Sequence, residues 1–241
     1  DIILGSTTTP NSLAMIDVVS ESQTPMISIA ASARIVEPVD AKKKWVFKTP
    51  QNDIMMSLAI AEHMANAGVK SVGFIGFADA YGEGWFQEFS KAAELKKIRI
   101  VASERYARTD TSVTAQVLKV TGASPDAVLI AGSGTPAALP AKALKERGYA
   151  GKMYQTHGVA NNDFLRVGGK DVDGTFLPSG GVLVAAQLPA NHPVRKAALE
   201  ALAAMPGERD IGLICSLLAD PELEVQARAI DLVVKLRHPD T

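Results

Sequence analysis

The chain has 241 residues, of which 47% are hydrophobic and 21% are charged, and its formal net charge is −1. This composition is that of an ordinary globular protein, long enough to bury one sizeable core or two small ones. The near-zero charge gives no electrostatic reason to expect nucleic acid or an anionic membrane as a partner. The single cysteine, Cys215, excludes an internal disulfide and any metal site built from several cysteines.

Short apolar runs and amphipathic stretches alternate along most of the chain. In chain order they predict a strand at 1–5, a helix at 10–22, a strand at 25–30, a helix at 53–67, a strand at 69–77, a helix at 83–95, a strand at 98–106, a helix at 112–123, a strand at 126–133, a helix at 137–148 and a strand at 152–158. Asp53 is expected to cap the second of these helices. Between the strand at 25–30 and that helix lies a basic stretch, residues 40–50, for which no element is predicted.

This alternation defines the fold class. Strands that are apolar almost without interruption are typical of parallel strands covered by helices on both faces. A TIM barrel would need eight strand–helix units, and fewer are present. We therefore predict an α/β fold with open, doubly wound parallel sheets.

The last part of the chain, residues 206–241, carries no strand signal. Two apolar stripes, within residues 213–218 and 225–236, are separated by a turn at Asp220-Pro221. They predict an α-hairpin that resembles one HEAT-type repeat. Because a single repeat cannot bury its apolar face alone, we expect the hairpin to pack on the α/β body, on another chain or on sequence that is absent.

The segments that follow the predicted strands are candidates for a binding site, because ligands of open α/β sheets bind outside the carboxyl ends of the strands. These segments are "STTTP" from Ser6, "AASAR" from Ala30, "ADAYGEG" around Tyr81, "SGTP" from Ser133 and "HGVAN" from His157. Hydroxyl groups and backbone N–H groups at helix N-termini bind carboxylates well. Any single serine or threonine here could equally be a helix cap, although four in a row exceed what capping requires.

Nucleotide binding and catalysis find little support. In the corner "GFADAYGEG", Asp79 and Glu83 would repel a phosphate, and no Walker A motif occurs. These two acids form either a carboxylate pair or, more simply, a turn acid followed by an acid at a helix N-terminus. Cys215 lies beside an apolar stripe and is interpreted as a core residue. With no nucleophile–base motif and no ligand-spaced histidine pair, we predict neither an enzyme nor a cofactor.

Four segments, "GSTTTPNSLAM", "TPMISIAASA", "FADAYGEGW" and "THGVAN", resemble type I periplasmic binding proteins of the leucine/isoleucine/valine class, the substrate-binding components of ABC transporters. The resemblance runs from Asp1 to about Ala198. It implies two flavodoxin-like lobes that close on a ligand held between them. The implied divisions are a partial first lobe at 1–50, a second lobe at 51–178 and a return crossing with a helix at 179–205, before the hairpin at 206–241.

The resemblance also implies a ligand site shared by both lobes, made by Thr7 or the neighbouring Ser6, Ala30, Ser32 and Tyr81. Ser133 and His157, in the loops after two later strands, are added as candidates. The loops of the first lobe would bind the ligand carboxylate through hydroxyl and N–H groups. Tyr81, expected to be exposed, would cover the ligand from the second lobe, or would alternatively pack on Trp85 at the rim. Arg34 could add a guanidinium to the carboxylate, although a solvated loop arginine is the simpler interpretation.

His157 is a departure from the family pattern. Amino-acid-binding members carry an acidic residue in this loop, which pairs with the α-ammonium group of the ligand. A neutral imidazole cannot neutralise an ammonium group, and a protonated one would repel it. The hypothesis is therefore a ligand without an α-ammonium group, such as a branched-chain or aromatic 2-oxo acid. The alternative is an amino acid ligand that His157 does not contact.

A second departure concerns completeness. Family members begin with a strand–helix–strand segment ahead of "DIILG", and the chain opens directly on a strand with no signal peptide, so we expect that upstream sequence has been removed. A truncated or rearranged chain, whether a gene fragment or an engineered chimera, would have low stability or self-associate through uncovered sheet edges or the hairpin. The predicted function is a periplasmic solute-binding component with an ABC transporter permease as partner. The alternative is a structural or interaction protein without a complete ligand site.

Overall fold

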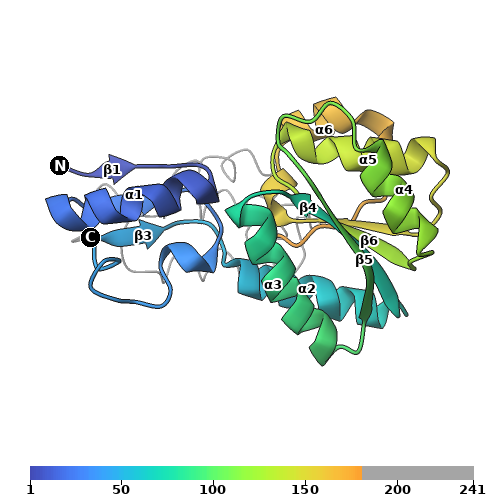
Figure 1. Ribbon diagram of the computed structural model, residues 1–241, viewed down its shortest axis with the longest axis horizontal. Helices are drawn as coiled ribbons and strands as arrows, with labels where there is room; N and C mark the ends of the chain where they lie inside the picture. The colour runs from blue at the N-terminus through green and yellow to red at the C-terminus, as the bar shows by residue number, and fades with distance from the viewer. Residues whose placement is uncertain (181–241) are drawn as a thin grey trace, which may run out of the picture. The chain divides into compact units, whose positions relative to one another are not determined.

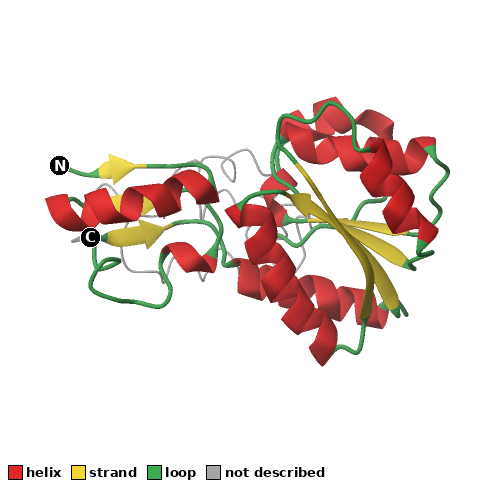
Figure 2. Ribbon diagram, viewed as in Figure 1, coloured by secondary structure: helices red, strands yellow, loops and turns green. Residues whose placement is uncertain are grey.

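The computed structural model describes residues 1–180, and residues 1–178 form one compact unit. This unit contains two parallel sheets with helices packed on them (Figures 1 and 2). The predicted hairpin at 206–241 and most of the predicted return crossing at 179–205 lie outside the described residues. No helix among the described residues combines the length and the apolar character needed to cross a membrane.

The first sheet has three parallel strands in the order β1-β2-β3: β1 is Ile3–Leu4, β2 is Met26–Ser28 and β3 is Val46–Lys48. Helix α1, Thr9–Ser22, connects β1 to β2 and buries Ile16 and Val19 against Met26. Strand β3 lies in the basic stretch for which no element was predicted. It has only three residues, one of them a lysine, so the apolar run that marks a strand is too short to recognise.

The second sheet has four parallel strands in the order β5-β4-β6-β7: β4 is Ser71–Phe77, β5 is Arg99–Tyr106, β6 is Ala127–Ala131 and β7 is Lys152–Gln155. The two central strands, β4 and β6, are buried at every residue. Burial on both faces is the reason that they are apolar without interruption. All observed pairings are parallel, which confirms the predicted α/β fold class.

Helices cover both faces of this second sheet (Figure 1). They are α2, Asp53–Asn66; α3, Ala80–Leu95; α4, Thr114–Gly122; α5, Ala138–Glu146; and α6, Asn162–Gly168. Helices α2 and α3 pack together on one face, and α4 and α5 cover the other. The five helices predicted within the described residues are confirmed, but α3 begins three residues before the predicted Glu83, and α6 was not predicted.

Asp53 does not cap α2 as predicted. Asn52 occupies the N-cap position, and Asp53 is the first helical residue, only 1% exposed. One oxygen of its carboxylate accepts hydrogen bonds from the N–H groups of Ala33 at 2.9 Å and Ile54 at 3.1 Å. Burial raises the pKa of this carboxyl group, and the hydrogen bond from Ala33 opposes that shift. Asp53 therefore ties the start of α2 to the loop that follows β2.

Candidate functional site

A cavity of about 410 Å³ opens at the carboxyl ends of the strands of both sheets. Every described strand contributes to it through the segment that follows: residues 7–9 after β1, 29–31 after β2, Pro50 after β3, Tyr81 after β4, Arg108 after β5, Ser133 and Gly134 after β6, and His157 and Gly158 after β7. Carboxyl ends of parallel strands are where α/β proteins bind ligands. The volume lies within the range of roughly 300–1,000 Å³ that small-molecule sites occupy.

The structure brings together five of the seven predicted site residues at this cavity: Thr7, Ala30, Tyr81, Ser133 and His157. Ser6 does not line it, because its hydroxyl accepts the N–H of Thr8 at 3.1 Å and turns the chain into α1. Ser32 does not line it either, since its side chain is fully buried beside the Asp53 carboxylate. Arg34 is exposed and lies outside the cavity lining.

Thr9 belongs to the predicted "STTTP" segment but was not singled out. It is the first residue of α1, it is fully buried, and its hydroxyl has no hydrogen-bond partner among the described residues. An unpartnered buried hydroxyl costs about 1–3 kcal/mol, which a ligand oxygen would recover. The Ala30 N–H group, which was predicted to contact the ligand, already donates a hydrogen bond to Ser28 Oγ at 3.1 Å. Among the described residues, the Thr9 hydroxyl is therefore without a hydrogen-bond partner, whereas the Ala30 N–H group has one.

Tyr81 is not the exposed lid that the sequence led us to expect. Its side chain is only 4% exposed, and its hydroxyl is hydrogen-bonded to the Thr156 hydroxyl at 2.8 Å. Its ring lies 6.3 Å from that of Phe77 and 6.4 Å from that of Trp85, measured between centroids. Burial raises the pKa of the phenol, which therefore stays neutral. Tyr81 forms a wall of the cavity, held by the Thr156 hydroxyl and packed near the rings of Phe77 and Trp85.

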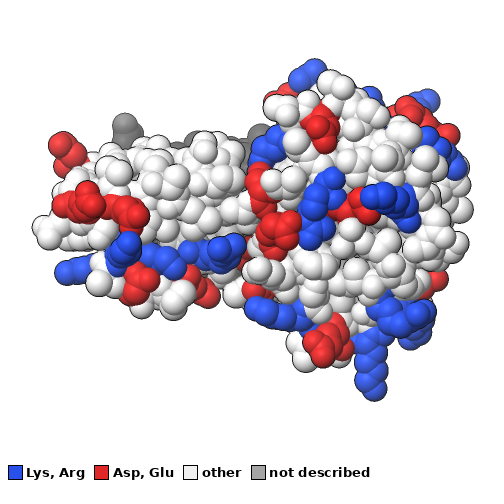
Figure 3. Space-filling view, in the orientation of Figure 1, with Lys and Arg blue, Asp and Glu red and all other residues white. Residues whose placement is uncertain are grey.

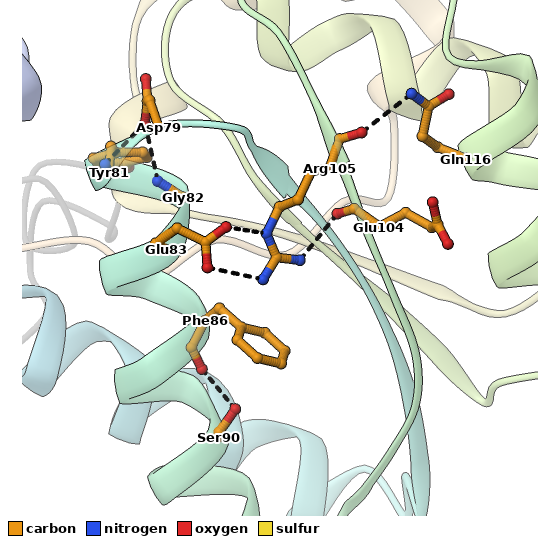
Figure 4. A network of polar contacts seen from close by, with 9 residues as sticks. All are labelled: Asp79, Tyr81, Gly82, Glu83, Phe86, Ser90, Glu104, Arg105 and Gln116. Carbon is orange, nitrogen blue, oxygen red and sulfur yellow. Dashed lines mark hydrogen bonds and ion pairs between the residues drawn. The ribbon is translucent and has the colours of Figure 1, made fainter.

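The two acids of the glycine-rich corner have separate partners. Asp79 caps α3 with one carboxylate oxygen, and its other oxygen accepts a hydrogen bond from Arg108 Nε at 2.7 Å. Glu83 accepts from Nε and Nη2 of Arg105 on β5, as Figure 4 shows, and this hydrogen bonding lowers the pKa of Glu83. Neither acid lines the cavity. They are a cap and a helix-surface ion pair, not a catalytic pair.

Arg108 is a second cavity residue, besides Thr9, that the sequence did not single out. Its Nε donates to Asp79, its Nη1 donates to Ser133 Oγ at 3.2 Å, and its guanidinium carbon lies 4.1 Å from the centre of the Phe77 ring. These two hydrogen bonds use two of the five N–H donors of a guanidinium group. Arg108 follows β5 by two residues, so examining every basic residue just beyond an apolar strand would have identified it.

His157 begins the turn after β7. Both of its ring nitrogens are buried and lack a hydrogen-bond partner among the described residues, and its ring lies 5.8 Å from that of Trp85. Burial, assisted by the positive charge of Lys48, lowers the pKa of His157 to about 4. The imidazole is therefore neutral at pH 7 and offers one hydrogen-bond donor and one acceptor.

The charge of the lining follows from these side chains. Among the described residues that line the cavity none is acidic, and Arg108 carries the one full positive charge. Elsewhere, acidic and basic side chains are interspersed over the face of the molecule drawn in Figure 3. On that face the charges are of mixed sign, so it shows no field of one sign that would act over a distance.

Two parallel α/β sheets whose strand ends share one cavity are the architecture to compare with known proteins. Over residues 1–213 the chain matches the family described as "Periplasmic binding protein". It is 40% identical to an extracellular ligand-binding receptor from Rhodopseudomonas palustris HaA2, whose crystal structure aligns with a TM-score of 0.77 over 98% of this chain and 71% of that chain. The chain therefore belongs to the periplasmic binding protein family. No curated protein gives a significant match.

Two more distant structures share the fold and hold ligands. A solute-binding protein of an ABC transporter from R. palustris, in complex with 4-hydroxybenzoate, is 21% identical, with a TM-score of 0.63 over 70% of this chain and 46% of that chain. A branched-chain amino acid ABC transporter structure from Thermus thermophilus, with bound valine, is 15% identical, with a TM-score of 0.66 over 99% of this chain and 61% of that chain. At these identities the likeness shows the fold alone.

Proposed function

We propose that the chain is the periplasmic solute-binding component of an ABC transporter, with a permease as its partner, and that it binds a small organic carboxylate between its two lobes. The observation that carries this proposal is the cavity of about 410 Å³ that the strand ends of both sheets line together. Hydroxyl groups, an arginine and a neutral imidazole face this cavity, and they are the groups that hold an organic anion in proteins.

The charges of the lining restrict the class of ligand. A buried α-ammonium group needs an acidic partner, and the described lining residues include none. His157, with its pKa lowered to about 4, cannot take that role. The ligand that fits is therefore an aromatic or branched-chain acid without an α-ammonium group, such as an aryl acid or a 2-oxo acid. 4-Hydroxybenzoate belongs to this class and valine does not.

The roles of the lining side chains follow from their hydrogen-bonding state. The Thr9 hydroxyl, which has no partner among the described residues, and the Thr7 hydroxyl lie at the N-terminus of α1 and donate to the ligand from the first lobe. Ala30 and Tyr81 form walls of the cavity, and Ser133 contributes its hydroxyl. The ring nitrogens of His157, which lack partners within the described residues, bind an uncharged oxo or hydroxyl group.

Isothermal titration calorimetry with matched ligands tests this proposal. We compare 4-methyl-2-oxopentanoate with leucine, which differ only in the oxo and ammonium groups, and 4-hydroxybenzoate with valine. The acids are expected to bind at least tenfold more tightly than the amino acids, because the described lining residues offer no acidic partner for an ammonium group. Tight binding of leucine or valine, with no heat from any of the acids, would refute the proposed ligand class.

A further inference from the structure

Arg108 lines the cavity, and its guanidinium group is hydrogen-bonded to Asp79 and Ser133. This arrangement suggests a specific site for one group of the ligand. Resting on the proposed function, we propose that Arg108 binds the carboxylate of the ligand and that Asp79, which does not touch the ligand, fixes the direction of the guanidinium. Arg108 lines the cavity and Asp79 does not. An anion in the cavity therefore meets the guanidinium and not the carboxylate behind it.

The guanidinium is fixed on several sides. One Asp79 oxygen is anchored by the first N–H groups of α3, at 2.8 Å from Tyr81 N and 3.1 Å from Gly82 N. The other Asp79 oxygen accepts from Arg108 Nε at 2.7 Å, so the helix cap and the ion pair share one carboxylate. A carboxylate that is itself immobile holds the planar fork of an arginine in one direction.

Two further contacts complete this support. Ser133 Oγ accepts from Nη1 at 3.2 Å, and the guanidinium carbon lies 4.1 Å from the centre of the Phe77 ring. The side chain of Arg108 is 29% exposed, and its hydrogen bonds to Asp79 and Ser133 use two of its five N–H donors. Because the donors are ordered before a ligand arrives, little side-chain entropy is lost on binding. Such an arginine discriminates an acid from its uncharged amide.

The test compares an acid with its own amide. Titration calorimetry measures 4-hydroxybenzoate and 4-hydroxybenzamide against the unmodified chain and against Arg108→Gln. A hydrogen-bonded charge pair of this kind changes affinity by about 10- to 150-fold. Arg108→Gln is therefore expected to weaken acid binding by about that factor, while affinity for the amide changes by less than about threefold.

A matched control is available on the preceding strand. Arg105→Gln removes the same charge three residues earlier, but Arg105 is paired with Glu83 and does not line the cavity. It is expected to leave both affinities unchanged. Asp79→Asn keeps a helix-capping side chain but loses the charge that holds Nε. It is expected to reduce the ratio of acid to amide affinity by about tenfold, a readout that a purely structural role would not move.

The outcomes separate the two proposals. If the unmodified chain binds acids and Arg108→Gln leaves their affinity unchanged, the role of Arg108 is overturned while the proposed function stands. Equal losses for acid and amide would also overturn that role, because they would indicate a damaged cavity rather than a lost charge. If the unmodified chain binds none of the acids, the proposed function and the role of Arg108 both fail.

Discussion

Substitution of Gly82 by alanine is expected to destabilise the chain by about 4 kcal/mol or more, the range of the most disruptive single substitutions. A Cβ at this position would lie 1.9 Å from the carbonyl oxygen of Phe77 and 2.7 Å from its carbonyl carbon and nitrogen. These are backbone atoms of the buried strand β4, so relief requires that the strand or the start of α3 moves. Urea unfolding monitored by circular dichroism measures the loss.

The same helix provides a matched control. A Cβ at Gly84, one residue beyond Glu83, would meet Ser32 Oγ at 3.4 Å and Asp53 Oδ2 at 3.6 Å, which are ordinary contact distances. Gly84→Ala is expected to be tolerated, because alanine gains up to about 1 kcal/mol over glycine within a helix. Equal stabilities of the two variants would contradict the close approach of α3 to the end of β4.

The titration of His157 is expected to produce the second large effect, a loss of about 3 kcal/mol in the free energy of unfolding between pH 7 and pH 4. Burial, with the charge of Lys48, lowers the pKa of the folded state from 6.5 to about 4. As pH falls, the unfolded chain takes up this proton first. The contribution is therefore fully present above pH 6.5 and is lost as pH falls towards 4.

The measurement is urea unfolding across this pH range for the unmodified chain and for His157→Gln. Glutamine keeps a donor and an acceptor but does not titrate, so the variant should lose that part of the pH dependence. If both proteins show the same slope of stability against pH between 4 and 6.5, the imidazole is not desolvated as the structure indicates.

The fold was predictable where burial requires a recognisable pattern of apolar residues in the sequence. Strands β4 and β6 are enclosed on both faces, so every residue is apolar or small and the run is unmistakable. Strand β3 was missed because its own composition does not mark it as a strand. It is held in place by pairing with β2, for example at Met26↔Val46. The start of α3 was misplaced because Asp79 caps a helix whose first turn is rich in glycine.

The binding segments were also predictable, but not the side chains within them. Parallel strands bring their carboxyl ends together, so the loops at residues 7–9, 29–31 and 157–158 had to converge. Which side chain faces the cavity depends on loop dihedral angles, for which a single sequence carries little information. This is why Thr9 was passed over, Ser32 was placed in the cavity, and Tyr81 was expected to be an exposed cover of the ligand.

Arg108 illustrates a different difficulty. Its role depends on three neighbours, Asp79, Ser133 and Phe77, that come from separate segments of the chain. Its place just beyond β5 marks it as a candidate in the sequence, but only the tertiary fold brings these three neighbours around it. Arg34, by contrast, lies within a predicted binding segment of the sequence but is exposed to solvent in the structure.

Hydrogen–deuterium exchange with and without a bound acid tests most directly whether the ligand lies between the two lobes. With 4-methyl-2-oxopentanoate or 4-hydroxybenzoate bound, we expect slower exchange in both halves of the site at once: around Thr9 and Ala30 in the first lobe, and around Tyr81, Arg108 and His157 in the second. Protection confined to one lobe, or absent from both while the acid is bound, would contradict a site shared by the two sheets.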